Sequence, residues 1–381
     1  MISSTAPTAV DDDFVQRADA FAAKLSARAQ DEPQNRFQGM PSDADSRAIN
    51  SIMGREGWIG LHWHPEFGGR GLSPMHTVAA EERFGYHWLP LSGYLLSVKT
   101  IGNAMLRFAS RELQRRLLPE IAAGEIVFCQ GFSEPEAGSD LASLRTTARR
   151  DGDRWIVNGH KIWTSSAQLA DWIYLAVRTE EDAVAHRGLS VIVADMRTPG
   201  IEVREIETLG GGVLCEVFLR DVEVPAGQTV GEPGAGWAVL MGTLDHERIT
   251  SEKLGVVSRM IDDLDPHIAT ASARRVLGRF RGEAQAARLH GHHATDLLAA
   301  GSPASAAASM AKVSIALLAQ RLAAWAVEEL GPHALVERGP GALLEGRLAA
   351  FYRASVASTI SGGALEIQRR VIARRRLGCP S

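Results

Sequence analysis

The segment FCQGFSEPEAGSDL, residues 128–141, decides how the rest of this chain is organised. An apolar run that suits a β-strand meets a turn of small and polar residues, among them Ser133, Gly138 and Ser139. Small residues let a ligand approach the backbone closely, and backbone N–H groups together with hydroxyls can hold a phosphate group. The local chemistry leaves two interpretations open: a ligand-binding turn, and a polar loop that joins two domains.

The residues before this segment are expected to form helices. Phe14, Ala18, Phe21 and Leu25 recur at helical spacing, which predicts an amphipathic helix near the start of the chain. We predict an N-terminal α-helical domain over residues 1–126, whose first ten residues form a loose tail. The helices expected in it span residues 11–29, 75–84, 91–108 and 111–123.

After residue 126 the pattern favours strands. The pair Asn158-Gly159 lies between RWIV at 154–157 and HKIWTS at 160–165. An Asn-Gly pair between two such runs predicts a β-hairpin, because both residues tolerate positive φ. We therefore predict a middle β-barrel or sandwich domain over residues 127–236. Its further strands are expected at 171–179, 189–194, 201–206 and 216–224.

From Trp237 onward the chain is again helical in pattern, and the segment lengths suit a four-helix bundle. This bundle is the predicted C-terminal domain, residues 237–381. The order of helices, sheet and helices gives an α+β fold class. The bundle helices are expected at 237–266, 271–298, 304–330 and 342–376.

Composition excludes several classes of function. A net charge of -4 argues against a nucleic-acid partner, which usually requires a basic surplus. The three cysteines are far apart and suit a reducing compartment rather than a disulfide framework or a zinc site. The first residues lack a secretory signal, and no stretch approaches the roughly 18 apolar residues of a membrane span. We expect a cytoplasmic protein with no membrane contact. His290, His292 and His293 are interpreted as a solvated helix face, so no metal site is predicted.

Seven stretches, spread in order over nearly the whole chain, resemble the acyl-CoA dehydrogenase family. SEPEAGSD at 133–140 resembles the flavin-binding signature of that family, and NGHKIWTSSA at 158–167 follows it at the expected place. One motif alone is weak evidence, whereas a collinear set is specific. The other five stretches are GWIGLHWHPEFGGRG (57–71), LLPEIAAGE (117–125), EVFLRDVEVP (216–225), LDHER (244–248) and EIQRRVIARRRLG (366–378).

The resemblance implies a fold with a helical N-terminal domain, a middle β domain and a C-terminal four-helix bundle. It also implies FAD, extended between the middle and C-terminal domains and partly across a subunit interface. By position, Ser139 lies near both the pyrophosphate of FAD and the CoA portion of the thioester. The residues that the resemblance places beside FAD in the middle domain are Gln130, Phe132, Ser133, Gly138, Ser139, Trp163 and Ser165.

In the C-terminal domain the resemblance places Arg274, Gln285, Gly331 and Glu366 at the cofactor. Arg274 and Gln285 resemble contacts made from a neighbouring subunit. Three positions depart from the family pattern: Leu277 replaces a Phe, Pro332 replaces a Gly, and Ala364 replaces a Thr. Similar substitutions occur in family members that work as pairs of unlike subunits, in which one subunit has lost FAD contacts.

Desaturation of a thioester requires a base for the α proton, and a carboxylate in a dry pocket suits this task. Many family members carry that Glu in the loop before the last helix, where this chain has Gly362. A minority, such as isovaleryl-CoA dehydrogenase, place it on a bundle helix in a Leu-Asp-x-Glu-Arg context, which matches residues 244–248. The resemblance therefore implies Glu247 as the base, with Arg248 supporting the site or the substrate. The alternative is that Glu247 and Arg248 form an ordinary solvated pair.

The predicted function is FAD-dependent α,β-dehydrogenation of an acyl thioester, carried by CoA or by an acyl-carrier protein. Electrons are expected to pass to an electron-transfer flavoprotein. The split cofactor site implies a homodimer or homotetramer, or a complex with an unlike subunit. Two alternatives stay open: a related flavin oxidase or monooxygenase, and an FAD-poor subunit that completes a partner's site.

Overall fold

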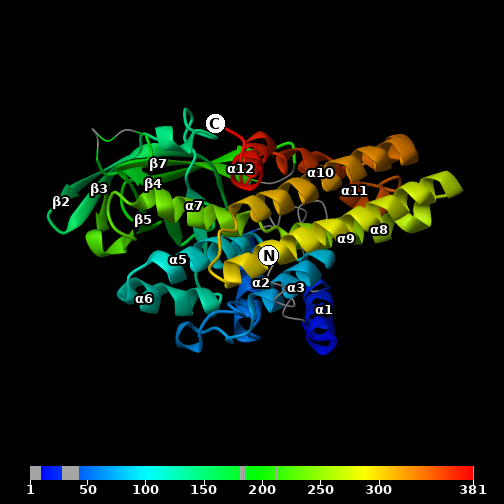
Figure 1. The fold of residues 1–381 in the computed structure, drawn as a ribbon, viewed down its shortest axis with the longest axis horizontal. Helices are drawn as coiled ribbons and strands as arrows, with labels where there is room; N and C mark the ends of the chain where they lie inside the picture. Colours follow the sequence, from blue (N-terminus) through cyan, green and yellow to red (C-terminus); the bar gives the residue numbers. More distant parts are fainter. Residues whose placement is uncertain (1–9, 28–42, 181–182, 184, 211–212, 381) are drawn as a thin grey trace.

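The computed structural model describes residues 10–27, 43–180, 183, 185–210 and 213–380. The chain runs from helices through a sheet back to helices, which is the predicted order (Figure 1). All but one residue of the expected N-terminal tail lies outside the described residues. The N-terminal helices are α1 Asp12–Ser26, α2 Asp43–Arg55, η2 Pro65–Phe67, α3 Pro74–Tyr86, α4 Ser92–Tyr94, η3 Leu95–Gly102, α5 Asn103–Phe108 and α6 Arg111–Ala122.

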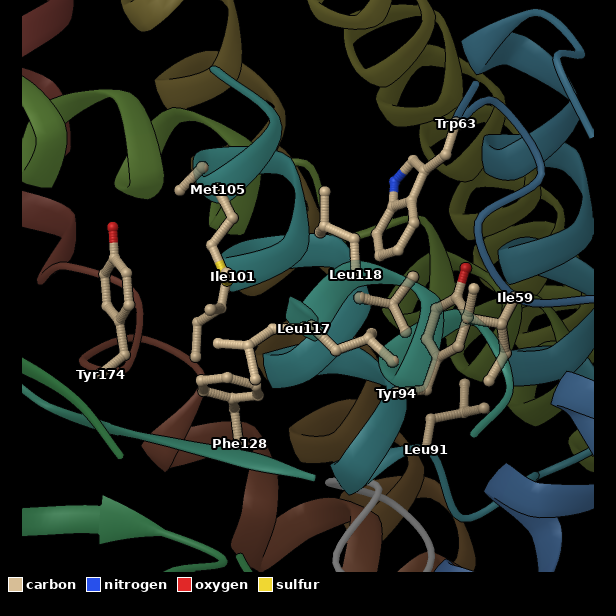
Figure 2. Packing of buried hydrophobic residues seen from close by; sticks show 14 of the residues in the cluster. Ile59, Trp63, Leu91, Tyr94, Ile101, Met105, Leu117, Leu118, Phe128 and Tyr174 are labelled. Atoms are coloured by element: carbon tan, nitrogen blue, oxygen red, sulfur yellow. The ribbon is translucent and has the colours of Figure 1, made fainter. Parts of the chain in front are cut away.

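The helical domain and the sheet share one apolar core. Figure 2 shows Ile101 and Leu117 packed toward Phe128 of the first strand, with Tyr174 of the sheet at the edge of the same cluster. Trp63 lies in this core and its Nε1 donates a hydrogen bond to Asn103 Oδ1 at 3.1 Å. Because the core crosses the domain boundary, the segment that starts at Phe128 is held rigidly on the helices.

The helix expected over residues 91–108 contains a π-helical stretch. η3 has the wide π-type turn, and Thr100 Oγ1 donates to the carbonyl of Leu95, five residues earlier. Such wide turns occur mostly as local insertions and often lie at functional sites. Here the stretch turns Leu95, Leu96 and Lys99 toward a cavity described below.

The described strands form one connected sheet in the order β6-β7-β3-β2-β4-β5-β8, with β1 paired to β4. Buried side chains of the strands, among them Cys129, Val157, Ile173 and Val217, meet in a common core. The strands are β1 Phe128–Gly131, β2 Thr147–Asp151, β3 Arg154–Ser165, β4 Trp172–Arg178, β5 Leu189–Asp195, β6 Ile201–Glu207, β7 Val213–Pro225 and β8 Thr229–Val230.

The hairpin predicted at Asn158-Gly159 is wrong, because β3 continues through this pair. The side chain of Asn158 bonds across to Asp221, accepting from its backbone N at 2.9 Å. A Cβ on Gly159 would stand 2.3 Å from Thr146 Oγ1, so this glycine serves a close approach between neighbouring segments. The true hairpin joins β2 to β3 at Gly152, which has φ +62°.

The C-terminal bundle is built from α8, α9, α10 and α11, whose apolar residues form one core. Two of the four expected helices are divided. The segment 237–266 breaks after Glu247, and the segment 342–376 breaks at a loop that contains Gly362 and Gly363. Both breaks lie at the candidate site. The helices are α7 Gly236–Glu247, α8 Ser251–Leu264, α9 Ala271–Ala299, α10 Ser305–Leu330, α11 Arg347–Ala357 and α12 Leu365–Leu377, with short turns η4 Leu141–Ser143, η5 Ala226–Gln228, η6 Asp265–His267, η7 Gly331–Leu335 and η8 Leu343–Gly346.

One stretch, Ser305–Leu335, has the length and mean hydropathy (1.3) of a membrane span. It is α10 with the turn that follows, and α10 packs against α9, α11 and α12. Half of the most apolar part of this stretch is buried inside the protein. Packing in the bundle therefore accounts for its apolar character, as is usual for a core helix.

The N-terminal domain is tied to the bundle by a buried charged trio. Lys99 of η3 donates to Glu81 of α3 at 2.9 Å and to Glu252 of α8 at 2.5 Å. Burial alone would lower the pKa of Lys99, but the two carboxylates raise it above its ordinary value. Close packing of α3 on α8 permits this contact, since a Cβ on Gly85 would stand 1.9 Å from the Glu252 carbonyl oxygen.

Candidate active site

Two cavities meet at Glu247 and Gly362. The larger has a volume of about 470 Å³ and lies between β1, α7 and α12. The smaller, of about 140 Å³, lies between η3, the end of β3 and the start of α8. The larger is lined by Gln130, Phe132, Ser133, Gly138, Ser139, Leu141, Trp237, Met241, Leu244, Glu247, Arg248, Gly362, Gly363, Ile367, Gln368, Arg370, Val371, Arg374 and Arg375. The smaller is lined by Ser92, Leu95, Leu96, Lys99, Thr100, Ser165, Ser166, Glu247, Thr250, Glu252, Lys253, Lys312, Ser361 and Gly362.

Glu247 is the last residue of α7, and its carboxylate faces both cavities. Gln130 Nε2 donates to Glu247 Oε2 at 3.4 Å. A Cβ on Gly362 would stand 3.3 Å from Glu247 Oε1, although the two residues are far apart in sequence. The carboxylate on the helix thus occupies the space in front of the glycine in the loop. The alternative of an ordinary solvated Glu247–Arg248 pair does not describe this arrangement, since Arg248 is buried and its ion pair is with Asp245.

The turn after β1 is held by a buried ion pair that the sequence did not indicate. Glu134 accepts from the backbone N of Arg145 at 2.6 Å and of Thr146 at 2.9 Å, and Lys161 Nζ donates to it at 2.7 Å. Lys161 also donates to the Phe132 carbonyl. Burial would raise the pKa of Glu134, but Lys161 and these hydrogen bonds outweigh burial and lower it. Both carboxylate oxygens are occupied, which fixes the turn.

Trp163 lies in a β-bulge and points its ring outward. The bulge falls between Lys161 and Thr164, where the pairing of β3 with β7 shifts register. Trp163 has φ +59° and is 56% exposed. A positive φ in a bulky residue costs about 1–3 kcal/mol and is found mostly at functional sites. The ring is therefore exposed to solvent two residues from Ser165, which lines the smaller cavity.

A row of arginines forms one wall of the larger cavity. Arg370 and Arg374 are four residues apart on α12 and share a helix face, with Arg375 beside them and Arg248 approaching from the end of α7. Burial lowers the pKa of Arg248, whose Nε has no hydrogen-bond partner among the described residues. Guanidinium groups bind phosphate and carboxylate oxygens with paired hydrogen bonds. The helical spacing of the arginines on α12 could have predicted from the sequence that they share one face.

The structure brings five of the middle-domain candidates together at the larger cavity and Ser165 to the smaller one, whereas Trp163 and the C-terminal candidates line neither. Arg274 and Gln285 lie on the exposed side of α9, and Gly331 lies at the end of α10 with φ +71°. Glu366 is 78% exposed at the start of α12. None of these four lines either cavity within the described chain. Their predicted contacts with the cofactor stay predictions, and those of Arg274 and Gln285 require a second subunit. Leu277 packs fully buried in the bundle core.

Lys312 lies behind Gly362 at the edge of the smaller cavity. It is 2% exposed, and its Nζ donates to the Ser358 carbonyl at 2.9 Å. Burial, together with the nearby charge of Lys253, lowers the pKa of Lys312 to about 7. His246, the residue before Glu247, lines a separate cavity with His62.

Lys312→Met is expected to flatten the pH dependence of stability. The folded pKa of Lys312, about 7, lies below its ordinary value of 10.5, so between these values the unfolded chain binds more protons. Stability from this group therefore rises as pH increases from 7 to 10.5, by up to about 1.4 kcal/mol per pH unit. Urea denaturation of the wild type and the variant across this range measures the difference. If the free energies of unfolding of the wild type and the variant change in parallel with pH, the lowered pKa of Lys312 is contradicted. Lys24→Met, on the exposed side of α1, serves as the control.

The chain thus combines the order of helices, sheet and helices with two cavities that meet at the Glu247 carboxylate. Family models for the acyl-CoA dehydrogenase N-terminal, middle and C-terminal domains match residues 8–125, 129–222 and 234–377. The chain belongs to the acyl-CoA dehydrogenase family and is an oxidoreductase of that kind. Members of this family are flavoproteins, generally FAD-dependent.

The chain is similar to named relatives over most of its length. Acyl-CoA dehydrogenase IpdE1 of Mycobacterium tuberculosis is 37% identical over 344 residues, which cover 88% of each chain. The structure of the Tcur3481-Tcur3483 steroid ACAD matches with a TM-score of 0.88 at 29% identity, covering 98% of this chain and 99% of that one. The ChsE4-ChsE5 complex from Mycobacterium tuberculosis matches with a TM-score of 0.85 at 31% identity, covering 98% and 99%.

Proposed function

We propose that this chain catalyses the FAD-dependent α,β-dehydrogenation of an acyl-CoA, with Glu247 taking the α proton. The observation that carries the proposal is the position of the Glu247 carboxylate, at the junction of the two cavities and in front of Gly362. A thioester that enters through the larger cavity places its acyl group in the smaller one. The carbon atoms next to the thioester then lie beside this carboxylate.

The residues around the junction fit a flavin. Gln130 Oε1 is buried and has no hydrogen-bond partner among the described residues, so it is free to accept from a ligand N–H. Trp163 offers an exposed ring in a strained bulge, and Ser165 offers a hydroxyl beside it. FAD, when bound, supplies the two-electron acceptor for the β hydride, which the side chains cannot provide.

Neighbouring groups keep Glu247 ready as a base. Gln130 donates to one carboxylate oxygen, which orients the group and leaves the other oxygen toward Gly362. Arg248 lines the larger cavity beside it, and Lys312 Nζ lies 3.7 Å from the same Cβ position of Gly362 that Glu247 Oε1 approaches to 3.3 Å. Substrate binding excludes water from the junction, and this strengthens the electrostatic attraction between base and α proton.

The arginine wall of the larger cavity supports CoA as the carrier. Arg248, Arg370, Arg374 and Arg375 suit a ligand with several phosphates. Acyl-CoA carries more phosphate than the single phosphopantetheine arm of an acyl-carrier protein. The two carriers are separated by comparing acyl-CoA with acyl-phosphopantetheine, which carries only the one phosphate of the carrier-protein arm. Equal affinity for both contradicts the role given to the arginines.

Anaerobic titration of the purified flavoprotein with a panel of acyl-CoAs tests the proposal. Bleaching of the flavin by an acyl-CoA is the expected result. A flavin that is reduced only by a separate reductase supports the alternative of a related monooxygenase. We further propose an electron-transfer flavoprotein as acceptor, which is tested by its reduction in the same mixture.

Trp163→Ala is expected to weaken FAD binding. An aromatic contact contributes about 0.5–1.5 kcal/mol beyond the area it buries, which corresponds to a roughly twofold to tenfold increase in Kd. Flavin absorbance after titration of the apoprotein with FAD measures this change. Leu209→Ala, at another exposed apolar side chain of the middle domain, is the matched control. An unchanged Kd in the Trp163 variant removes Trp163 from the flavin site.

A second candidate is a subunit that completes the site of an unlike partner. The exposed position of Arg274 and Gln285 on α9 favours a contact across subunits, and two structural neighbours carry the names of two chains. Purification of the chain alone decides between the two. A yellow dimer or tetramer supports the first proposal, and a colourless chain that becomes stable only with a second gene product supports the other.

A further inference from the structure

Three lysine side chains border the smaller cavity, alongside Leu95 and Leu96. Lys99, Lys253 and Lys312 all border it. We propose that this cavity selects short acyl groups that end in a carboxylate, which Lys253 and Lys312 bind. The inference rests on the proposed function, because it concerns the acyl end of the same substrate.

Lys253 and Lys312 have unused hydrogen-bonding capacity. Lys99 forms ion pairs with both Glu81 and Glu252, so neither Lys99 nor Glu252 needs a partner from the substrate. Lys253 makes no hydrogen bond and no ion pair within 4.0 Å in the part of the chain that the structure describes. Lys312 donates to one carbonyl, that of Ser358. An ammonium group has three donors, so the pair faces the cavity with a surplus of donors.

Two neighbouring lysines without a carboxylate partner are costly to charge unless an anion joins them. Buried charges in proteins are normally paired. Among the described side chains, no carboxylate lies within ion-pairing distance of Lys253 or Lys312, and Lys253 disfavours the charged form of Lys312. Glu247 lies across the cavity without forming an ion pair to them within the described chain, which preserves it as a base. A carboxylate from the substrate supplies the missing partner.

The dimensions of the site set the length of the acyl group. Lys312 Nζ and Glu247 Oε1 stand 3.7 and 3.3 Å from the same point, the Cβ position of Gly362. The anion site therefore lies only a few bonds from the reacting carbons. The cavity, at about 140 Å³, is well below the 300–1,000 Å³ of pockets for larger ligands. Both facts favour a short dicarboxylic acyl group over a long or branched apolar one.

The test compares glutaryl-CoA with valeryl-CoA, which has the same number of acyl carbons but no carboxylate. Binding to the FAD-loaded protein is measured by calorimetry, and flavin reduction is measured separately under anaerobic conditions. We expect glutaryl-CoA to bind at least tenfold more tightly. In Lys253→Met this preference is expected to fall at least fivefold, whereas Lys253→Arg retains most of it. Lys24→Met on α1 controls for the loss of one positive charge.

Equal affinity for the two thioesters, or a preference that Lys253→Met leaves unchanged, overturns the inference. If the inference fails in this way but valeryl-CoA still reduces the flavin, the proposed dehydrogenation stands without the anion site. If both bind and neither reduces the flavin, the proposed function fails, while the ratio of affinities still decides the anion site. Lys253 is the primary target because it is only partly buried, so its substitution leaves the core intact.

Discussion

Replacement of Glu247 by Gln is expected to slow flavin reduction by bound acyl-CoA by a factor of about 10²–10⁴, the usual contribution of a general base. The amide has nearly the same shape and keeps a hydrogen bond with Gln130, but it cannot take a proton. FAD is expected to stay bound, since Glu247 is not among the predicted cofactor contacts. Single-turnover absorbance of the flavin measures the rate, and the flavin content of the purified variant verifies occupancy.

A matched substitution shows whether the effect is specific. Glu329→Gln, on an exposed part of α10, removes one carboxylate elsewhere in the same domain and is expected to leave the rate unchanged. The double variant Glu247→Gly with Gly362→Glu returns the carboxylate to the same space from the loop. It is expected to recover part of the rate, because the φ of +67° at position 362 disfavours a side chain there. Near-normal turnover of Glu247→Gln excludes this residue as the base.

Replacement of Lys161 by Met is expected to cost about 3–5 kcal/mol of stability, the usual effect of breaking a buried ion pair. Glu134 then remains buried with a charge that only two backbone N–H groups compensate. The Phe132 carbonyl also loses its donor, so the turn at 133–140 loosens and FAD dissociates faster. Chemical denaturation measures the first effect, and loss of flavin absorbance on dilution measures the second.

Lys24→Met, on the exposed side of α1, controls for the change in charge. Lys161→Met within about 0.5 kcal/mol of the wild type, the range of ordinary surface substitutions, contradicts a structural role for the pair. A loss of stability without faster flavin release shows that the ion pair stabilises the fold but does not hold the turn at 133–140 for FAD binding.

The order of domains was predictable because hydrophobic periodicity switches twice along the chain. The boundaries at 126/127 and 236/237 stay predictions. Local signals failed where long-range contacts decide the conformation. Asn158-Gly159 has hairpin chemistry, but Asp221 and Thr146 from other segments place the pair inside a strand. The break after Glu247 was missed because the helical pattern continues through it, whereas the loop at Gly362 was implied by the family resemblance although periodicity had joined residues 342–376.

Glu247 was chosen because the loop before the last helix has Gly362 where many family members have the catalytic Glu. The structure adds that the two positions converge in space, which sequence spacing cannot show. The partners Glu134 and Lys161 were hidden because each lies in a stretch whose pattern indicates only a turn or a strand. Lysines of the smaller cavity escaped notice because they come from η3, α8 and α10, which only the folded chain brings together.

The trio of Lys99, Glu81 and Glu252 limits how the domains of this chain can be exchanged with those of a relative. Glu81 and Lys99 belong to the first domain, whereas Glu252 follows Glu247 by five residues in the last. A chimera that joins the first domain of a relative to the last domain of this chain leaves one charge buried without its counterpart unless all three residues are inherited together. The unit that can be exchanged is therefore a set of distant residues and not a contiguous module.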